Sequence, residues 1–262
     1  MNRLVVAVAL ALAGCATQKS ESKPAAASSP ATSSASVDRY DAIAGASDRT
    51  GADRALDPGR KPAAFLRAMD VAPGMKVGEL FAGGGYTTEL LARAVGPTGH
   101  VYAENPKWVL EKFGGKGWAD RLARPVNANV TREDTELDAP FPGLDGQLDL
   151  VVTNANYHDA VWMKVDRAQM NRAVFAALKP GGRYVVSDSS AKPGTGLADV
   201  QTLHRIDEAS VTSEVEAAGF KLAGHSDALR NPADTRDWSA SPHAAGARRG
   251  TNDRFILIFA KP

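Results

Sequence analysis

Short apolar runs alternate with segments of helical periodicity along residues 40–262 of the chain. This alternation predicts an α/β fold, in which a mostly parallel sheet carries helices on both faces. One run, at 148–153, is apolar throughout, as is typical of a strand buried on both faces. We expect the last run to form an apolar strand at the edge of the sheet. The predicted strands are residues 76–81, 100–103, 126–131, 148–153, 184–187, 220–223 and 255–260.

Helices are predicted between these strands from their start and stop signals. The first begins directly after a run of glycines, and either Thr87 or Thr88 can cap its first turn. Glycine, in two cases next to a proline, follows the end of each helical pattern and stops it. The predicted helices are residues 87–95, 167–178 and 208–218.

The first 15 residues have the pattern of an exported lipoprotein. Arg3 precedes a ten-residue apolar run, Leu4–Ala13. This run is too short to span a bilayer, which takes roughly 20 residues, but it fits the apolar region of a signal peptide. The sequence that ends at Cys15 resembles the bacterial lipobox, which implies cleavage before Cys15 and lipidation of its thiol. The alternative is an uncleaved helix on the membrane surface with an incidental cysteine.

A lipid anchor at Cys15 would hold an exported protein on the membrane, facing the periplasm. Ala16 takes the place of the acidic residue that acts as a retention signal, which favours the outer membrane. In residues 16–36, 17 of the 21 positions are Ala, Ser, Thr or Pro. Such a segment cannot bury enough apolar surface to fold, so we predict a flexible tether over residues 16–39 and one domain over 40–262.

Composition excludes several classes of function. The net charge is +1, and aromatic and basic residues are not interleaved, so we expect no nucleic-acid partner. Cys15 is the only cysteine, which excludes an internal disulfide and a thiolate metal site. The five histidines include no pair at HxxxH spacing, so no metal site is predicted.

A glycine-rich loop follows the first predicted strand. Residues 82–85 read Ala-Gly-Gly-Gly, and glycines between a strand and a helix let the backbone approach a ligand closely. A dinucleotide-binding fingerprint would need a third glycine at position 88, where this chain has threonine. This difference weakens the prediction of a nicotinamide cofactor without excluding it. Glu104 lies 19 residues after Gly85, at the end of the second strand. A carboxylate there can accept both hydroxyls of a ribose.

The stretch VGELFAGGGYTTELLARAVGPTGHVYAEN, residues 77–105, resembles motifs one and two of class I S-adenosylmethionine-dependent methyltransferases. More narrowly, the chain resembles a bacterial group of predicted methyltransferases. The segments that carry this narrower resemblance are DRTGADRALDPGRKP (48–62), NYHDAVW (156–162), TLHRIDEASVTSEVEAAGF (202–220), LRNPAD (229–234) and RGTNDRF (249–255). Together the resemblance covers residues 40–262. It implies a seven-stranded Rossmann-like fold and S-adenosylmethionine as cofactor.

The resemblance also implies a cofactor site. Glu104 would bind the ribose, and Glu79 ends the strand below the loop. Phe81 stands where the commonest pattern has its first loop glycine, which predicts a narrower pocket. Asn154 and Tyr157 occupy the outer places of a pattern like the NPPY of amine methyltransferases, but both prolines are missing. The candidate cofactor residues are Glu79, Ala82, Gly83, Gly84, Gly85, Glu104, Asn105 and Asn154.

His158 is the candidate general base, because an unperturbed imidazole titrates near neutrality, and Asp159 could orient it. The alternative is that residues 156–159 only cap the next helix. Residues 204–207 either line the substrate side or cap a helix through Asp207, and we favour the cap. The charges at 48–61 fit a solvated helical face, or a lid that brings Arg60 or Lys61 to the cofactor's carboxylate. A long polar connection, residues 228–252, suggests a substrate-side flap.

These observations predict an S-adenosylmethionine-dependent methyltransferase that acts on a small-molecule or envelope substrate. Two alternatives remain open. The first is a membrane-anchored, non-catalytic binding module on the same fold, because an exported domain meets a compartment in which S-adenosylmethionine is not expected to be abundant. The second is a nicotinamide-dependent oxidoreductase, which the threonine at position 88 disfavours.

Overall fold

The computed structural model describes residue 1 and residues 38–113 and 115–262. The predicted signal peptide, Cys15 and most of the tether lie outside the described residues. Among the described residues, the folded unit runs from Asp38 to Pro262. Within the described residues, no helix is both long and apolar enough to cross a membrane.

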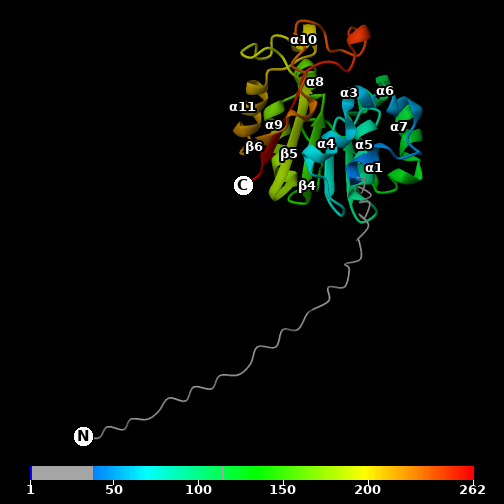
Figure 1. The fold of residues 1–262 in the computed structure, drawn as a ribbon, viewed down its shortest axis with the longest axis vertical. Coiled ribbons are helices and arrows are strands. Elements are labelled where there is room, and N and C mark those ends of the chain that lie inside the picture. Colours follow the sequence, from blue (N-terminus) through cyan, green and yellow to red (C-terminus); the bar gives the residue numbers. More distant parts are fainter. Residues whose placement is uncertain (2–37, 114) are drawn as a thin grey trace, which may run out of the picture. The chain divides into compact units, whose positions relative to one another are not determined.

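The described residues form a seven-stranded sheet with the order β3-β2-β1-β4-β5-β7-β6 (Figure 1). Neighbours from β3 to β5 are parallel, and β7 is antiparallel to both β5 and β6. The predicted mostly parallel, Rossmann-like sheet is confirmed. The strands are β1 (Lys76–Leu80), β2 (His100–Glu104), β3 (Val130–Glu133), β4 (Leu148–Asn154), β5 (Leu178–Ser189), β6 (Lys221–His225) and β7 (Arg254–Ala260).

Three details of the predicted strands were wrong. The strand β7 lies between β5 and β6 rather than at the edge, which buries Phe255 and Phe259 completely. The strand β3 begins at Val130 because Pro125–Asn127 forms a 3-10 turn instead of extended chain. The strand β5 begins at Leu178 and continues through the Lys-Pro-Gly-Gly sequence that was expected to end the preceding helix.

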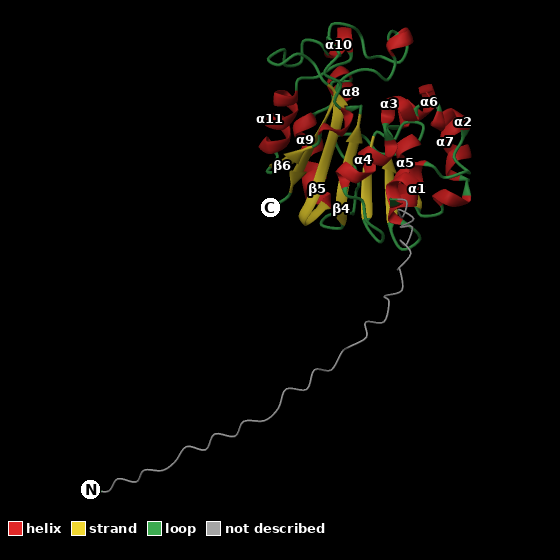
Figure 2. Ribbon diagram, viewed as in Figure 1, coloured by secondary structure: helices red, strands yellow, loops and turns green. Residues whose placement is uncertain are grey.

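Helices cover both faces of the sheet (Figure 2). Apolar side chains from α1, α4, α5, α6 and α7 form one cluster, and those from α8, α9 and α11 form the other. The helices are α1 (Arg39–Ala44), α2 (Gly51–Arg54), α3 (Asp57–Arg60), α4 (Pro62–Met69), α5 (Tyr86–Val95), α6 (Lys107–Phe113), α7 (Gly115–Leu122), α8 (Tyr157–Trp162), α9 (Arg167–Ala177), α10 (Val200–Leu203) and α11 (Glu208–Ala217).

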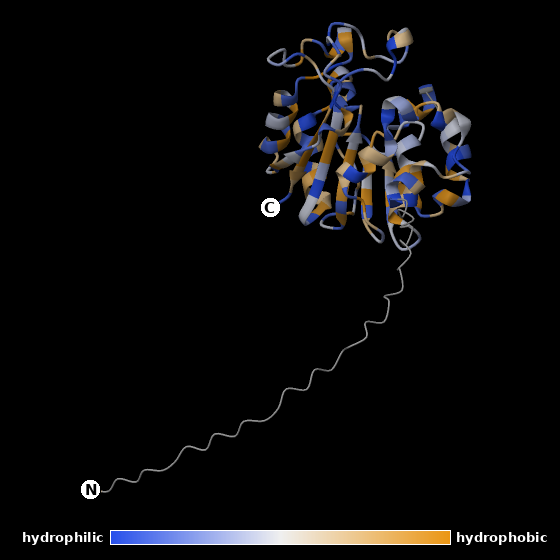
Figure 3. Cartoon of the chain, in the orientation of Figure 1, coloured by the Kyte–Doolittle hydropathy of each residue, from blue (hydrophilic) through white to orange (hydrophobic). Residues whose placement is uncertain are grey.

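The central strands supply both clusters because successive side chains point to opposite faces. In β4, Val151 packs in the cluster with α8 and α9, whereas Leu150 and Val152 pack in the cluster with α4 and α5. The strands are accordingly among the most apolar parts of the chain (Figure 3). Burial on both faces explains why an unbroken apolar run predicted this strand correctly.

Candidate functional site

The glycine loop between β1 and α5 contains two kinds of glycine. Gly83 and Gly84 face open space, because a Cβ atom on Gly84 would meet nothing within 4 Å and one on Gly83 only the Phe81 carbonyl at 4.0 Å. Gly85 is packed, because a Cβ there would lie 2.4 Å from the ring of Trp118 in α7. Gly85 also starts α5 with a φ of 78°, which glycine adopts without strain. The loop therefore offers bare backbone at Gly83 and Gly84.

Two neighbours hold this loop in shape. Asn105 is buried, and its side chain accepts a hydrogen bond from the Gly83 N–H at 2.8 Å and donates one to the Gly83 carbonyl at 3.2 Å. The backbone N–H of Ala82 donates to the Glu104 carbonyl at 2.8 Å. Asn105 was predicted to bind the cofactor. Both its side-chain oxygen and its side-chain nitrogen instead bind the backbone of Gly83 and position the loop.

Glu104 ends β2 and is completely buried beside the loop. One carboxylate oxygen, Oε2, accepts a hydrogen bond from the Phe81 N–H at 3.1 Å. The other oxygen, Oε1, is buried and has no hydrogen-bond partner among the described residues. Burial raises the pKa of Glu104 well above its ordinary value. A buried polar atom without a partner is costly, so this oxygen is suited to a hydroxyl donor from a ligand.

Asn154 lies on the other side of the loop, at the end of β4. Its Nδ2 donates to the Thr87 hydroxyl at 3.0 Å, while its Oδ1 is buried without a partner in the described part of the chain. The strands β2 and β4 flank β1, so unpartnered oxygens of Glu104 and Asn154 stand on either side of the glycine loop. Between β1 and β4 the order of strands reverses, which is where ligands bind in open α/β sheets.

Phe81 does not fill the space above the glycines. Its φ is 58°, in the left-handed region, and its side chain packs against the apolar cluster on the α8 and α9 face. Only its carbonyl oxygen comes within 4.0 Å of the position that a Cβ on Gly83 would take. The narrowing predicted from the sequence is therefore not seen over Gly83 and Gly84.

Glu79 is buried in β1, where its Oε2 accepts a hydrogen bond from the Thr88 hydroxyl at 2.5 Å. Burial raises the pKa of Glu79 to about 8, although Thr88 and the charges of Arg121 and Arg60 oppose the shift. The predicted cap of α5 by a threonine was wrong. Thr88 instead binds Glu79, Thr87 accepts from Asn154, and the helix starts from Gly85 without a side-chain cap.

Replacing Glu79 with Gln should change how stability depends on pH. Between the unfolded value, about 4.5, and the folded value, about 8, the native protein keeps a proton that the unfolded chain releases. The wild type therefore loses stability as the pH rises through this window, by up to roughly 1.4 kcal/mol per pH unit. The glutamine variant keeps an acceptor for Thr88 but lacks this slope. Urea unfolding at several pH values measures it, and a difference between the two proteins that stays constant with pH would contradict the assignment.

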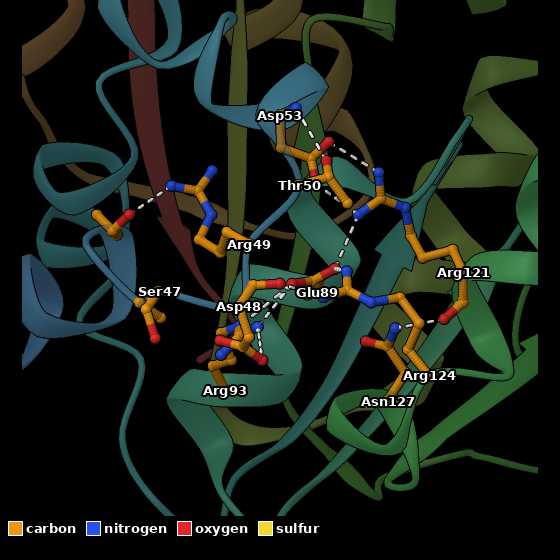
Figure 4. A network of polar contacts seen from close by, with 12 residues as sticks. Ser47, Asp48, Arg49, Thr50, Asp53, Glu89, Arg93, Arg121, Arg124 and Asn127 are labelled. Atoms are coloured by element: carbon orange, nitrogen blue, oxygen red, sulfur yellow. Dashed lines mark hydrogen bonds and ion pairs between the residues drawn. The ribbon is translucent and has the colours of Figure 1, made fainter.

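The charged segment 46–61, which we call the covering segment, is not a solvated face (Figure 4). Arg49 and Asp53 are buried. Both carboxylate oxygens of Asp53 bind Arg121 of α7 at 2.8 Å, and Asp48 binds Arg93 of α5 at 2.8 Å. The prediction of a solvated helical face was wrong, because the periodic charges meet opposite charges on the domain instead of water.

Glu89 is the centre of this network. Its carboxylate is 2% exposed and binds three guanidinium groups, Arg93 at 2.8 Å, Arg121 at 2.9 Å and Arg124. Arg121 also donates through Nε to the Gly84 carbonyl at 2.6 Å. Arg124 also donates to the backbone carbonyl of Asp48 at 2.6 Å. The network therefore joins the covering segment, α5, α7 and the glycine loop into one unit.

Arg60 ends α3 near the loop. Its guanidinium lies over the Tyr86 ring, 4.3 Å from the centroid, and it has no carboxylate partner within the described ranges. Burial lowers the pKa of Arg60, and the charge of Arg60 in turn lowers the pKa of Glu79. Lys61, the other candidate for a carboxylate ligand, is exposed and donates to the Ala228 carbonyl at 3.2 Å. Arg60 is the better placed of the two.

The covering segment also meets the flap, residues 228–252. The backbones of Gly59 and Gly250 touch so closely that a Cβ atom on Gly59 would lie 2.6 Å from the Gly250 Cα. Arg254 donates to the Gly59 carbonyl at 3.3 Å, and burial lowers its pKa to about 10. Because β7 runs antiparallel and starts at Arg254, the flap lies at the carboxyl edge of the parallel strands, beside the loop.

A cluster of titratable residues lies beyond β4 and β5. His158 is buried in α8, and its Nδ1 is 2.8 Å from an oxygen of Asp188, a completely buried residue near the end of β5. The other oxygen of Asp188 accepts the His158 backbone N–H at 2.8 Å. Asp188, which sequence reasoning did not single out, thus does the orienting predicted for Asp159. The only feature of the sequence that could have indicated Asp188 is that a carboxylate follows the apolar residues of a predicted strand.

The second nitrogen of His158 faces His204 and Asp159. Nε2 lies 3.3 Å from Nδ1 of His204 and 3.4 Å from Oδ1 of Asp159. Burial alone would lower the pKa of His158, but Asp188 and Asp159 outweigh it and raise the pKa to about 9. Burial and the neighbouring His158 lower the pKa of His204.

Of the two alternatives for residues 204–207, the favoured one, the helix cap, is confirmed. Asp207 caps α11 by accepting the Ala209 N–H at 3.1 Å, as predicted, and His204 lies against His158. The alternative that Asn156 caps α8 was wrong, since its side chain makes no cap bond and donates instead to Asp159 at 2.9 Å. The site thus has two parts. We call the part around Gly83 and Glu104 the loop side, and the part around His158, Asp159 and His204 the histidine side.

Comparisons with known proteins come from sequence and from structure. No protein-family model matches the chain. An arsenite methyltransferase of Halobacterium salinarum is 29% identical over 157 residues, which cover 57% of this chain and 35% of that protein. A ubiquinone/menaquinone biosynthesis C-methyltransferase, UbiE, of Burkholderia multivorans is 32% identical over 124 residues, which cover 46% of each chain. The chain therefore spans less than half the length of these curated relatives.

Solved structures share the fold at lower identity. An S-adenosylmethionine-dependent methyltransferase from Aquifex aeolicus has a TM-score of 0.55 and 16% identity, covering 79% of this chain and 90% of that one. The [4+2]-cyclase SpnF has a TM-score of 0.56 and 17% identity, covering 80% of this chain and 81% of that one. The chain therefore has the class I methyltransferase fold. Because a cyclase shares it, the reaction must be argued from the site.

Proposed function

We propose that this chain is a class I S-adenosylmethionine-dependent methyltransferase. The observation that carries the proposal is the buried, unpartnered Oε1 of Glu104 beside bare glycine backbone. The ribose of an adenosyl group has two adjacent hydroxyls that can donate to such a carboxylate. Methyltransferases among both the sequence relatives and the structural neighbours support the same cofactor.

The other groups around the loop fit the amino-acid part of this cofactor. An ammonium group beside Glu79 would favour the charged form of its buried carboxyl and bind it, and Arg60, which has no carboxylate partner among residues 38–113 and 115–262, can bind a carboxylate. The Gly83 and Gly84 backbone and Ala82 would lie against the ligand, while Asn105 and Gly85 keep the loop in shape. When bound, S-adenosylmethionine supplies an electrophilic methyl group next to its sulfonium. This assignment makes the covering segment a lid over the cofactor.

The histidine side would receive the methyl acceptor. It lies at the ends of β4 and β5, next to the unpartnered oxygen of Asn154. His158 stays the candidate base, with Asp188 rather than Asp159 fixing its ring. The relatives' names point to different acceptors, arsenite and a quinone precursor, so they do not identify the substrate class. A small-molecule or envelope substrate, and the membrane anchor at Cys15, remain proposals from the sequence.

Calorimetry on the full chain tests the cofactor directly. We expect S-adenosylmethionine and S-adenosylhomocysteine to bind with one site each, and NAD not to bind. Binding of NAD alone would overturn the proposal in favour of an oxidoreductase. No binding of any of the three would favour a non-catalytic binding module.

A further inference from the structure

Three side chains of the histidine side converge on one point. His158 and Asp159 come from α8, and His204 follows α10. One ligand atom from each lies within 4.8 Å of the other two. His158 Nε2 is 3.3 Å from His204 Nδ1 and 3.4 Å from Asp159 Oδ1. Two imidazole nitrogens and a carboxylate oxygen that face one another are the donors that first-row transition metals prefer.

The surroundings hold the His158 ring and the His204 backbone in defined conformations. Asp188 is completely buried and binds His158 twice, at the backbone N–H and at Nδ1. A carboxylate on one nitrogen of a histidine orients the ring and leaves the other nitrogen for a metal. His204 has a φ of 50°, a left-handed conformation that is unfavourable for most residues. Such backbone strain is typical of residues held in place at functional sites.

We propose that His158 Nε2, His204 Nδ1 and a carboxylate oxygen of Asp159 bind one divalent first-row transition metal ion. Three protein ligands leave coordination positions open, as in catalytic rather than structural sites. The open positions would take water or an oxygen atom of the methyl acceptor. Two neutral nitrogen ligands disfavour Mg²⁺ and Ca²⁺, which prefer oxygen. No ligand atom belongs to the loop side, so this site does not affect the proposed cofactor binding, but a metal here would replace the general-base role of His158 in the proposed function.

Metal binding and general-base catalysis exclude each other at His158. A nitrogen that coordinates a metal has no lone pair left to accept a proton. The prediction that no metal site exists considered ligands close in sequence, whereas the two histidines are 46 positions apart. The parallel order of β4 and β5 brings the segments that follow them together at one edge of the sheet.

The test uses the full chain without a histidine tag, freed of metal by a chelator and titrated with Zn²⁺ and Co²⁺. We expect one ion per chain, and for Co²⁺ the visible absorption of a site with nitrogen and oxygen ligands. His204→Asn should weaken binding by more than about 100-fold. Asparagine tolerates the left-handed backbone of residue 204, so this variant should keep its fold. Asp188→Asn, which keeps all three ligands, should weaken binding by about 10-fold to 100-fold.

His225→Ala removes an exposed histidine of β6 and is the matched control. It should bind both metals as the wild type does. Equal metal affinity of the wild type and His204→Asn, in variants that melt as the wild type does, would overturn the proposal, as would the absence of binding. None of these results depends on S-adenosylmethionine, so failure here and failure of the proposed methyltransferase are separable.

Discussion

Glu104→Ala should lower the affinity for S-adenosylmethionine by at least about 100-fold, because hydrogen bonds to a charged group contribute roughly 1.5–3 kcal/mol each and a ribose offers two. Glu104 has a buried carboxylate oxygen, Oε1, with no partner among the described residues, and it lies beside the glycine loop. Removing the side chain costs the loop the hydrogen bond from the Phe81 N–H, but Ala82 still binds the backbone carbonyl of residue 104 and Asn105 still binds Gly83. Calorimetry with the cofactor and its demethylated product measures the loss.

Two further variants test whether the loss of affinity comes from the lost ribose contact rather than from the lost negative charge or from altered folding. Glu133 is the register partner of Glu104 on the adjacent strand β3, so Glu133→Ala removes a carboxylate one strand further out. We expect it to bind the cofactor as the wild type does. Glu104→Gln keeps the shape and one acceptor and should lose less affinity than the alanine variant. If Glu104→Ala and Glu133→Ala had equal affinities, the ribose assignment would be wrong.

Glu89→Ala should destabilise the protein by about 3–5 kcal/mol, the range found when one partner of a buried ion pair is removed. Three guanidinium groups converge on the Glu89 carboxylate, which is 2% exposed, and the variant would leave them facing one another. For a domain of this size the melting temperature should fall by roughly 10 °C. Thermal unfolding followed by circular dichroism measures the change.

An exposed glutamate serves as the control for this second prediction. Glu111 lies on the surface of α6, and Glu111→Ala should shift the melting temperature by no more than about 2 °C. The Glu89 variant should also bind the cofactor more weakly, because Arg121 links the network to the Gly84 carbonyl. If the Glu89 variant were as stable as the Glu111 variant, the ion-pair network around Glu89 would contribute little to the stability of the fold.

The sequence predicted the sheet because the strands bury both faces and therefore appear as unbroken apolar runs. It predicted the glycine loop and Glu104 because both depend on residue type at a short, fixed spacing. It did not predict α1 and α4, and it indicated only a helical face over 48–61 where α2 and α3 lie, since these four helices span only four to eight residues. Pro62 occupies the first position of α4, where proline is favoured, and Phe65, Leu66 and Met69 of this helix are buried.

The parts of the site that escaped prediction depend on contacts between distant segments. Asp188 orients His158 from a different strand, 30 positions away. Asp53 and Arg121 are 68 positions apart, so periodicity within the covering segment could not reveal their pairing. Sequence spacing reports local structure, whereas these pairs are created by the order of the strands in the sheet.

The contact between Gly59 and Gly250 has a consequence for biosynthesis. Gly59 and Arg254, which bonds to it, are 195 positions apart. A nascent chain has therefore made the loop, Glu104 and both histidines before the strand that fastens the covering segment leaves the ribosome. The contacts of the covering segment with Arg93, Arg121 and Arg124 can form at that stage, whereas its contact with β7 forms only afterwards.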